Sequence, residues 1–324
     1  MSKTSSDAVR HVLNGPTMGT VWQATFHTAP DFDPAPLRAA LQAAVDEVDK
    51  QMSTWRPDST LMRLNRAAAG EWFAIPARLA EVLRLGLEIG RASGGLFDIG
   101  TGDAVGAWGF GPAAADPQAI RAAMTASRRP AHEVLELDGL LVRKRAAVIL
   151  DLNGTAKGYG VDRLTETLHA HGIADSLAGI DGEMRATGLR TDGSPWVVAV
   201  ESPDPDRRAA RSVLALQDAA VATSGDYRHR VAVGERYLSH TMDPARGAPL
   251  AAPPASVTVV ARTCAEADAW ATALMVASPG ARLDLAARNG LDALFLLRDG
   301  AAIRPLTTGA LFDAEPDQDR ITAP

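Results

Sequence analysis

The sequence predicts an α+β fold, organised as a single compound domain with a strand-rich second half and helices inserted between groups of strands. Helix-period apolar patterns dominate the first half of the chain, and short alternating segments dominate the second half. The sequence contains no internal repeat and no long linker. We therefore expect residues 1–14 to form an unstructured segment and residues 15–324 to form one folded domain.

The first half begins with a strand predicted over residues 20–28, which are rich in β-branched and aromatic side chains. Asp33-Pro34 then has the pattern of a helix start, and apolar residues follow at helical spacing as far as Met52. A second helix is expected over residues 78–92. Asp116-Pro117 opens a third helix with the same cap chemistry.

From His132 onwards the pattern changes to strands. HEVLEL and LLVRK flank Asp138-Gly139, which is a strong hairpin signal. Residues 147–152 (AVILDL) read as a buried strand that leads into a glycine-rich turn and a helix over 157–170. The remaining prediction is a helix over 265–276 and strands over 176–180, 196–201, 213–217, 228–233, 236–242, 256–261 and 291–297.

Composition excludes several classes of protein. With 46% hydrophobic and 22% charged residues the chain is an ordinary globular protein, and a net charge of -6 provides no basic field for nucleic acid. The single cysteine, Cys264, rules out an internal disulfide and a cysteine-based metal site. No apolar run is long enough for a transmembrane segment or resembles a signal peptide. We expect a cytoplasmic protein as written, and a periplasmic one if a leader has been trimmed.

The segment DLNGTAKGYGVD, residues 151–162, places a glycine-containing turn and Lys157 at the start of a helix. Free N–H groups and the lysine charge there can hold a phosphate. The segment matches neither the Walker pattern nor the dinucleotide fingerprint. A turn of this kind with a lysine is equally common in a purely structural setting.

The second motif is TCAEADAWAT, residues 263–272. Thr263 and Glu266 form a capping box, so a helix starts there. Asp268 and Thr272 are then four residues apart on one helix face, where a hard cation such as magnesium suits their oxygens. The alternative is structural: Asp268 accepts backbone N–H groups, and Thr272 bonds back to a carbonyl.

Four further positions carry chemistry only in combination. His240 at a strand end beside a turn aspartate can act as a general base, although a surface histidine is the commoner case. The segment around Ser224 resembles the turn that carries a catalytic nucleophile, but it lacks the GxSxG pattern. The alternative is a structural turn whose side chains bond its own backbone. Trp55 in a polar loop can stack on a planar ring. Glu183 ends the turn GIDGE, where acids can bond ribose hydroxyls or ring nitrogens.

Taken in order, these segments resemble the ApbE family of FAD:protein FMN transferases. The resemblance covers nearly the whole chain, and the collinear order makes it more specific than any single motif. The matching segments are MGT at 18–20 before the first predicted strand, the MSTW…STLMRLN loop at 52–65, FD at 97–98, WGF at 108–110, LDLNGTAKGYGVD, GIDGE, VATSGDY, SHTMDP and ADAWATAL.

The resemblance implies a role for each matching position. Asp268, Thr272 and the backbone carbonyl of Ala156 correspond to ligands of Mg²⁺, and His240 to the catalytic base. The cofactor-binding positions are Met18, Trp55, Lys157, Asp162, Glu183 and Ser224, with Trp55 where the family usually has tyrosine. Three places depart from the family pattern: Asp181 and Asn153 replace glycines, and Ala245-Arg246 replaces Arg-Thr.

The implied activity is magnesium-dependent transfer of FMN from FAD to a threonine or serine hydroxyl of an acceptor protein, with release of AMP. A metal-dependent FAD pyrophosphatase is the alternative enzyme, because water can replace the acceptor hydroxyl. A flavin-binding or delivery protein without chemistry is the third reading. Asp268, Thr272 and His240 are all present, which favours an enzyme. The expected partners are FAD and the acceptor flavoprotein.

Overall fold

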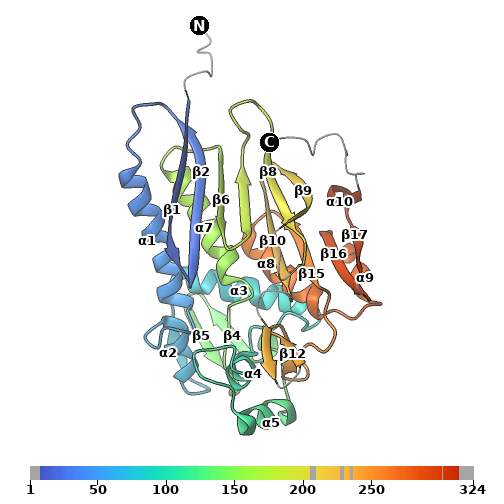
Figure 1. Cartoon of the computed structure of the whole chain (residues 1–324). Coiled ribbons are helices and arrows are strands. Elements are labelled where there is room, and N and C mark those ends of the chain that lie inside the picture. Colours follow the sequence, from blue (N-terminus) through green and yellow to red (C-terminus); the bar gives the residue numbers. More distant parts are fainter. Residues whose placement is uncertain (1–7, 205–208, 227–229, 234–235, 301, 314–324) are drawn as a thin grey trace.

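The computed structural model describes residues 8–204, 209–226, 230–233, 236–300 and 302–313. Its centre is an eight-stranded sheet in the order β1-β2-β6-β7-β10-β15-β16-β17, and every neighbouring pair is antiparallel (Figure 1). Its strands are β1 (Val9–Thr17), β2 (Thr20–Thr28), β6 (Ser176–Ile180), β7 (Glu183–Thr187), β10 (Ala219–Gly225), β15 (Ser256–Ala261), β16 (Asp292–Asp299) and β17 (Ala302–Thr308).

Smaller sheets lie around this centre. A three-stranded sheet has the order β3-β5-β4, and three hairpins pair β8 with β9, β11 with β12, and β13 with β14. Their bounds are β3 (Trp72–Ala74), β4 (Leu135–Asp138), β5 (Leu141–Lys144), β8 (Trp196–Glu201), β9 (Ala210–Leu216), β11 (Arg230–Val233), β12 (Arg236–Ser239), β13 (Met242–Asp243) and β14 (Ala248–Pro249).

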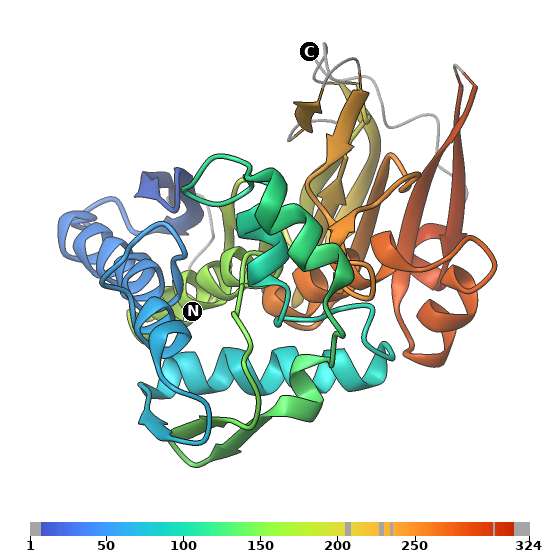
Figure 2. The same cartoon turned by 90° about the horizontal axis from the view of Figure 1, so that it is seen from below.

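Helices cover the central sheet mainly on one face, and seen from below the helices of the first half lie to one side of the later strands (Figure 2). α7 packs on β6 and β7, α8 packs on β10 and β15, and the two helices contact each other. The helices are α1 (Ala35–Met52), α2 (Thr60–Arg66), α3 (Ala77–Ala92), α4 (Gly102–Ala107), α5 (Pro117–Thr125), α6 (Ala131–Val134), α7 (Ala156–Ala170), α8 (Cys264–Val276), α9 (Arg282–Arg288) and α10 (Ala310–Asp313).

The sheet separates the apolar cores. On the helical face, Val257 and Val259 of β15 pack with α3 and α8. On the other face, Val260 of the same strand packs with the β8–β9 hairpin, whose Trp196 is buried. Alternate side chains of β15 thus enter different cores, as the two-residue period of a strand requires. α8 is enclosed almost all round, so a polar side chain on it needs a partner or a ligand.

The α+β class is confirmed, and several elements match their predicted ranges closely. β2, β6, β8 and β15 coincide with the predicted strands. The Asp116 side chain caps α5 by accepting a hydrogen bond from Gln118 N. In the α8 capping box, Thr263 Oγ1 accepts from Glu266 N while the Glu266 carboxylate accepts from Thr263 N.

The amino-terminal segment differs from its prediction. Residues 9–14, expected to be unstructured, form part of β1, and MGT at 18–20 is consequently the turn of a β1–β2 hairpin. The sequence did not predict this strand because Gly15 and Pro16 are residue types that are uncommon inside strands. β1 is an edge strand, where proline is tolerated.

Two other predictions in the first half were wrong. Residues 147–152 are not a strand, although Leu150 and Leu152 are fully buried as expected. The Asn65 side chain bonds both the N–H and the carbonyl of Leu150, which replaces the partners that a ladder would supply. His132 belongs to α6 rather than to the hairpin, whose strands begin at Leu135.

The second half contains strands that the pattern did not predict, namely β7, β10, β14 and β17. β10 consists of small residues such as Ala222 and Gly225, which carry little strand signal. The strand expected over 236–242 is divided between β12 and β13. Residues 228–229 of another predicted strand lie outside the described residues. None of the helices in the described part is long and apolar enough to cross a membrane.

Candidate active site at the junction of α7 and α8

The first turns of α7 and α8 are in direct contact because Gly158 has no side chain. A Cβ atom there would lie 2.3 Å from Cys264 O and 2.9 Å from Ala265 Cα. Thr155 Oγ1 donates a hydrogen bond of 3.3 Å to Ala265 O at the same contact. The glycine therefore sets the distance at which side chains of α8 meet the turn before α7.

Asp162 fixes the start of α8 from within α7. Its Oδ1 accepts from Cys264 N at 2.9 Å and pairs with the Arg185 guanidinium at 2.6 Å, and its Oδ2 accepts from Ala265 N at 2.9 Å. Burial raises the pKa of Asp162, and the arginine and these N–H groups oppose that change. Both oxygens are thus occupied inside the protein. A direct cofactor contact by Asp162 stays a prediction, while its role in positioning α8 is visible.

Asp268 lies one turn further along α8 and is only 5% exposed. Its Oδ2 accepts from Gly158 N at 3.1 Å, and its other oxygen accepts no hydrogen bond from the described residues. Burial raises the pKa of Asp268 to about 6, and the nearby Lys157 ammonium opposes this rise. A buried carboxylate with one unused oxygen is suited to bind a cation.

Thr272 lies on the same face of α8, as its spacing from Asp268 predicts. Its hydroxyl is 3.2 Å from Ser224 Oγ of β10. A Cβ built on Gly154 would lie 3.1 Å from Thr272 Oγ1, so the turn before α7 passes directly over the threonine. Asp268 therefore meets Gly158 and Thr272 meets Gly154, and Ala156, the first residue of α7, lies between these two glycines in the chain.

The oxygen atoms of Asp268, Thr272 and the Ala156 carbonyl are of the chemical type that binds a magnesium ion. A carboxylate, a hydroxyl and a backbone carbonyl are hard oxygen ligands, and Mg²⁺ commonly takes one or two carboxylates together with water and phosphate oxygens. The described residues contain no group of three or more His, Cys, Asp or Glu that could hold a metal by themselves. The role of Asp268, Thr272 and the Ala156 carbonyl as metal ligands stays a prediction.

Lys157 is the cation of this junction. Its Nζ lies 3.0 Å from Glu183 Oε1 and 3.1 Å from Asp181 Oδ2, and Asp268 adds a third nearby carboxylate. Burial lowers the pKa of Lys157, but these carboxylates raise it by more. One ammonium thus faces three carboxylates, which leaves the junction with an excess of negative charge.

Glu183 is as deeply buried as Asp268. It is 5% exposed, and its Oε2 has no hydrogen-bond partner among the described residues. Burial raises the pKa of Glu183 to about 8, while Lys157 acts in the opposite direction. An unsatisfied buried oxygen at this place fits the predicted contact with the cofactor.

Asp181, which stands where the family usually has glycine, adopts a backbone conformation typical of glycine. Asp181 has φ 53 and Gly182 has φ 107, so both residues occupy the left-handed half of backbone space between β6 and β7. Aspartate tolerates this conformation better than most residues. The substitution therefore keeps the turn and adds a carboxylate beside Lys157.

Met18 is held close to the junction by the β1–β2 turn. Thr17 pairs with Thr20, so Met18 and Gly19 form a two-residue turn with φ 44 and 73. Positive φ at both positions is typical of a type I′ hairpin. A Cβ on Gly160 of α7 would lie 2.9 Å from Met18 Cε. The side chain therefore covers α7 one turn after Lys157, and its contact with the cofactor stays a prediction.

Trp55 and His240 come from segments outside the junction. Trp55 lies between α1 and α2 and is 61% exposed, so its indole is available for stacking. His240 directly follows β12 and is half-buried. Figure 1 shows β12 below the central sheet. No contact described above ties either side chain to Asp268 or Lys157, and both roles stay predictions.

The other two departures lie in ordered turns. Asn153 donates from its backbone N and its side-chain amide to the two carboxylate oxygens of Asp151. Asp243 Oδ1 accepts from Ala245 N and Arg246 N, which closes the turn between β13 and β14. Side-chain bonding of the local backbone thus supports both turns despite the changed residues.

Sequence reasoning missed Gly158 and Arg185. The signal for Gly158 was the repeated spacing: Gly154 and Gly158 are four residues apart, as are Asp268 and Thr272. Matching periods of glycine and polar residues indicate two segments in close contact. Arg185 carried no signal, because the pairing of β7 with β6 is what brings it to Asp162.

Comparisons with known proteins find relatives that match most of the chain. A model of the ApbE family matches residues 18–295. FAD:protein FMN transferase from Klebsiella pneumoniae is 32% identical over 300 residues, covering 90% of this chain and 86% of the relative. The Vibrio cholerae protein of the same name is 35% identical over 292 residues, covering 88% of this chain and 87% of the relative.

Solved structures give the same result for the fold. Flavin transferase ApbE from Vibrio cholerae superposes with a TM-score of 0.82 at 32% identity, covering 93% of this chain and 97% of that one. Pseudomonas stutzeri flavinyl transferase ApbE, in its apo form, also gives 0.82 at 34% identity, covering 93% and 95%. Sequence and structure together show that this chain belongs to the ApbE family.

Proposed function

We propose that this protein transfers FMN from FAD to a threonine or serine hydroxyl of an acceptor protein, in a reaction that requires Mg²⁺ and releases AMP. The names of its relatives support flavin transfer. The observation that carries the finer proposal is the negative junction. Buried Asp268 has an unused oxygen there, beside the Thr272 hydroxyl and the start of α7.

The junction is suited to a pyrophosphate together with a divalent cation. The Lys157 ammonium favours phosphate oxygens, whereas the N–H groups of Ala156 and Gly158 in the first turn of α7 are already bonded to Leu152 O and Asp268 Oδ2. Asp268, Thr272 and the Ala156 carbonyl would hold the Mg²⁺. When bound, the ion would neutralise phosphate charge and stabilise the departing AMP.

The protein's own groups then have separate tasks. Glu183 fixes Lys157 through its 3.0 Å ion pair, and Asp162 fixes the first turn of α8. His240 accepts the proton of the acceptor hydroxyl. The hydroxyl oxygen forms a bond to the phosphorus on the FMN side, the bond from that phosphorus to the bridging oxygen breaks, and the electron pair leaves with AMP.

Intact mass spectrometry tests the proposal directly. The protein is incubated with FAD, MgCl₂ and a purified protein domain that carries flavin on a threonine, supplied in its flavin-free form. We expect the domain to gain the mass of FMN less one water, with AMP released in equal amount. Release of free FMN and AMP without a labelled domain would show a pyrophosphatase, and FAD that is bound but never consumed would show a delivery protein.

A His240→Ala variant tests the base. Transfer should slow by about 10²–10⁴-fold with FAD affinity nearly unchanged, because a general base acts on the incoming hydroxyl in the transition state. The rise of rate with pH through a group near neutrality should disappear in the variant. A variant that transfers FMN at the wild-type rate excludes His240 as the base.

A further inference from the structure

A recess separate from the junction lies between the 251–254 loop, the start of α9 and the ends of β16 and β17, and is called here the arginine recess. Its volume is about 620 Å³. The charged residues that line it are Arg282, Arg298, Arg304, Asp226 and Asp299. It shares no lining residue with the group formed by Asp268, Thr272, Lys157 and Glu183.

Arg282 is the deepest charged group of the arginine recess. The residue is only 6% exposed, and its Nε donates a 3.1 Å hydrogen bond to Ala277 O. Its Nη atoms have no hydrogen-bond or ion-pair partner among the described residues. Burial lowers the pKa of Arg282, and no carboxylate compensates for that burial. Burying an unpaired charge is costly, so this guanidinium is expected to serve a ligand.

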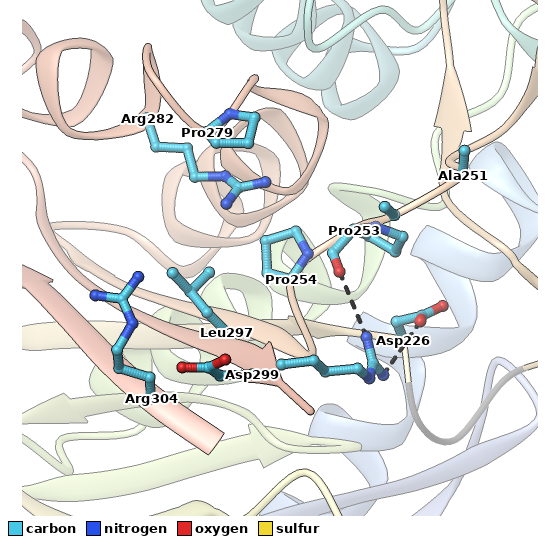
Figure 3. Close-up of a pocket in the computed structure, with 11 residues that line it drawn as sticks. Asp226, Ala251, Pro253, Pro254, Pro279, Arg282, Leu297, Asp299 and Arg304 are labelled. Atoms are coloured by element: carbon cyan, nitrogen blue, oxygen red, sulfur yellow. Dashed lines mark hydrogen bonds and ion pairs between the residues drawn. The ribbon is translucent and has the colours of Figure 1, made fainter. Parts of the chain in front are cut away.

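The other charges of the recess do not supply that partner. Arg298 pairs with Asp226 at 3.2 Å and also donates to Pro253 O. In the described part of the chain, Asp299 and Arg304 form no ion pair. Figure 3 shows Arg282 and Arg304 on one side of the recess and Asp226 on the other. Figure 3 also shows Asp299 beside Arg304, and the three arginines of the lining outnumber its two aspartates, so the recess carries an excess of positive charge.

The recess is also rigid. Pro253, Pro254 and Pro279 form its walls, and Arg282 is held in place by its bond to Ala277 O. Fixed φ angles at three prolines and an anchored guanidinium reduce the entropy that binding would otherwise cost. Arginine in such a setting selects oxyanions, because its planar fork matches carboxylate and phosphate oxygens.

We propose that the arginine recess binds an oxyanion, a carboxylate or phosphate group, with Arg282 as the principal contact and Arg304 as the second. The oxyanion can be a free small anion or an acidic side chain of a polypeptide that docks beside β10. Ser224 and Asp226 lie two residues apart at the end of that strand, so an occupant of the recess is a neighbour of the Ser224–Thr272 contact.

Calorimetric titration at low ionic strength tests this on the full chain. The probes are inorganic phosphate, a blocked hexapeptide with two central glutamates, and the same peptide with glutamines. We expect phosphate or the glutamate peptide to bind, and the glutamine peptide not to bind. Arg282→Gln should weaken binding about tenfold or more, because hydrogen bonds to charged groups are the strong ones. Arg282→Lys should retain part of the affinity.

Two further variants keep the test decisive. Arg304 is exposed, so Arg304→Gln should leave the core folded. This substitution should weaken binding by a smaller factor than Arg282→Gln. Arg288→Gln, on the exposed side of α9, is the control and should have no effect. FAD affinity should be equal in all variants, because the recess shares no residue with the junction.

The outcomes separate the sources of the oxyanion. Phosphate binding as tightly as the glutamate peptide shows that a free anion suffices, whereas tenfold tighter binding of the peptide shows a preference for a polypeptide. Either result supports the site. The proposal is overturned if neither probe binds, or if both bind to wild type, Arg282→Gln and Arg304→Gln with equal affinity.

Discussion

The junction of α7 and α8 and the arginine recess both contain buried charged side chains, but the balance of charge is opposite in the two regions. At the junction, Lys157 faces the carboxylates of Asp181, Glu183 and Asp268. In the recess, buried Arg282 has no carboxylate partner in the described part of the chain. The first arrangement lacks a cation and the second lacks an anion, so each is completed by a ligand of the opposite sign.

The two regions also differ in how the fold maintains them. The junction depends on backbone contact, because Gly158 lets the two helices touch and Asp162 caps α8. The recess depends on loops with proline walls and on one anchored arginine. Substitutions at the junction should therefore affect stability and activity together, whereas those in the recess should affect binding alone.

The largest effect is expected from removing the cation ligand at the junction. Asp268→Asn should lower FMN transfer by about 100-fold or more, because even second-shell changes at metal sites cost about 10–100-fold. Thr272→Ala should cost less, since a neutral hydroxyl compensates less charge. Mg²⁺ should raise the melting temperature of wild type but not of Asp268→Asn. Asp284→Asn, exposed on α9, is the control. Undiminished transfer by Asp268→Asn would remove Asp268 from the metal role.

Gly158→Ala tests the backbone contact. The added methyl group meets Cys264 O at 2.3 Å, so the helices must separate, at a cost of about 1–3 kcal/mol in unfolding free energy. Urea denaturation measures this loss. Gly106→Ala in α4 is a matched control, because nothing lies within 4 Å of its Cβ position. The control should be neutral or stabilising by up to about 1 kcal/mol. Equal stability of the two variants would contradict the close approach.

Because the junction holds more carboxylates than cations, we expect the unfolding free energy of the metal-free protein to depend on pH. Burial raises the pKa of Asp268 to about 6 and of Glu183 to about 8, so both retain protons in the folded state that the unfolded chain has released. Folding then takes up protons, and the unfolding free energy should fall as pH rises from about 4 to 8.

Glu183→Gln isolates the upper part of this change. Its unfolding free energy, measured by urea denaturation at several pH values, should vary less than that of wild type between about pH 6 and 8. Glu88→Gln, at an exposed position of α3, should follow the wild-type curve. A Glu183→Gln curve parallel to wild type would show that Glu183 is already ionised at the lower end.

The smallest effect is expected at Asp181. Asp181→Gly removes a 40% exposed partner of Lys157, which contributes about 0–1 kcal/mol, and also relieves the left-handed backbone. These terms oppose each other, so the unfolding free energy should change by less than about 1 kcal/mol. Asp181→Ala also loses the ion pair but keeps a side chain in the left-handed backbone conformation, so it should be less stable than Asp181→Gly in the same assay. The reverse order would mean that the ion pair, not the backbone, decides this position.

The sequence alone determined the local elements whose signals lie within a few residues. The α8 capping box, the four-residue spacing of Asp268 and Thr272, and strands such as β15 needed no long-range information. The collinear motifs also identified the ApbE family, which the comparisons confirm. These features depend on periodicity and cap chemistry, which act between neighbours in the chain.

Only the tertiary structure decided which residues share a site. A cofactor contact of Asp162 stays a prediction, but only the contact of α7 with α8 shows that its carboxylate also caps the later helix. Residues 147–152 had the apolar content of a strand, yet Asn65, 85 residues from Leu150, took its backbone hydrogen bonds. That Arg282 has no carboxylate partner within the described residues likewise depends on loops remote in sequence. Such pairings depend on where distant segments pack, and local pattern carries no information about that.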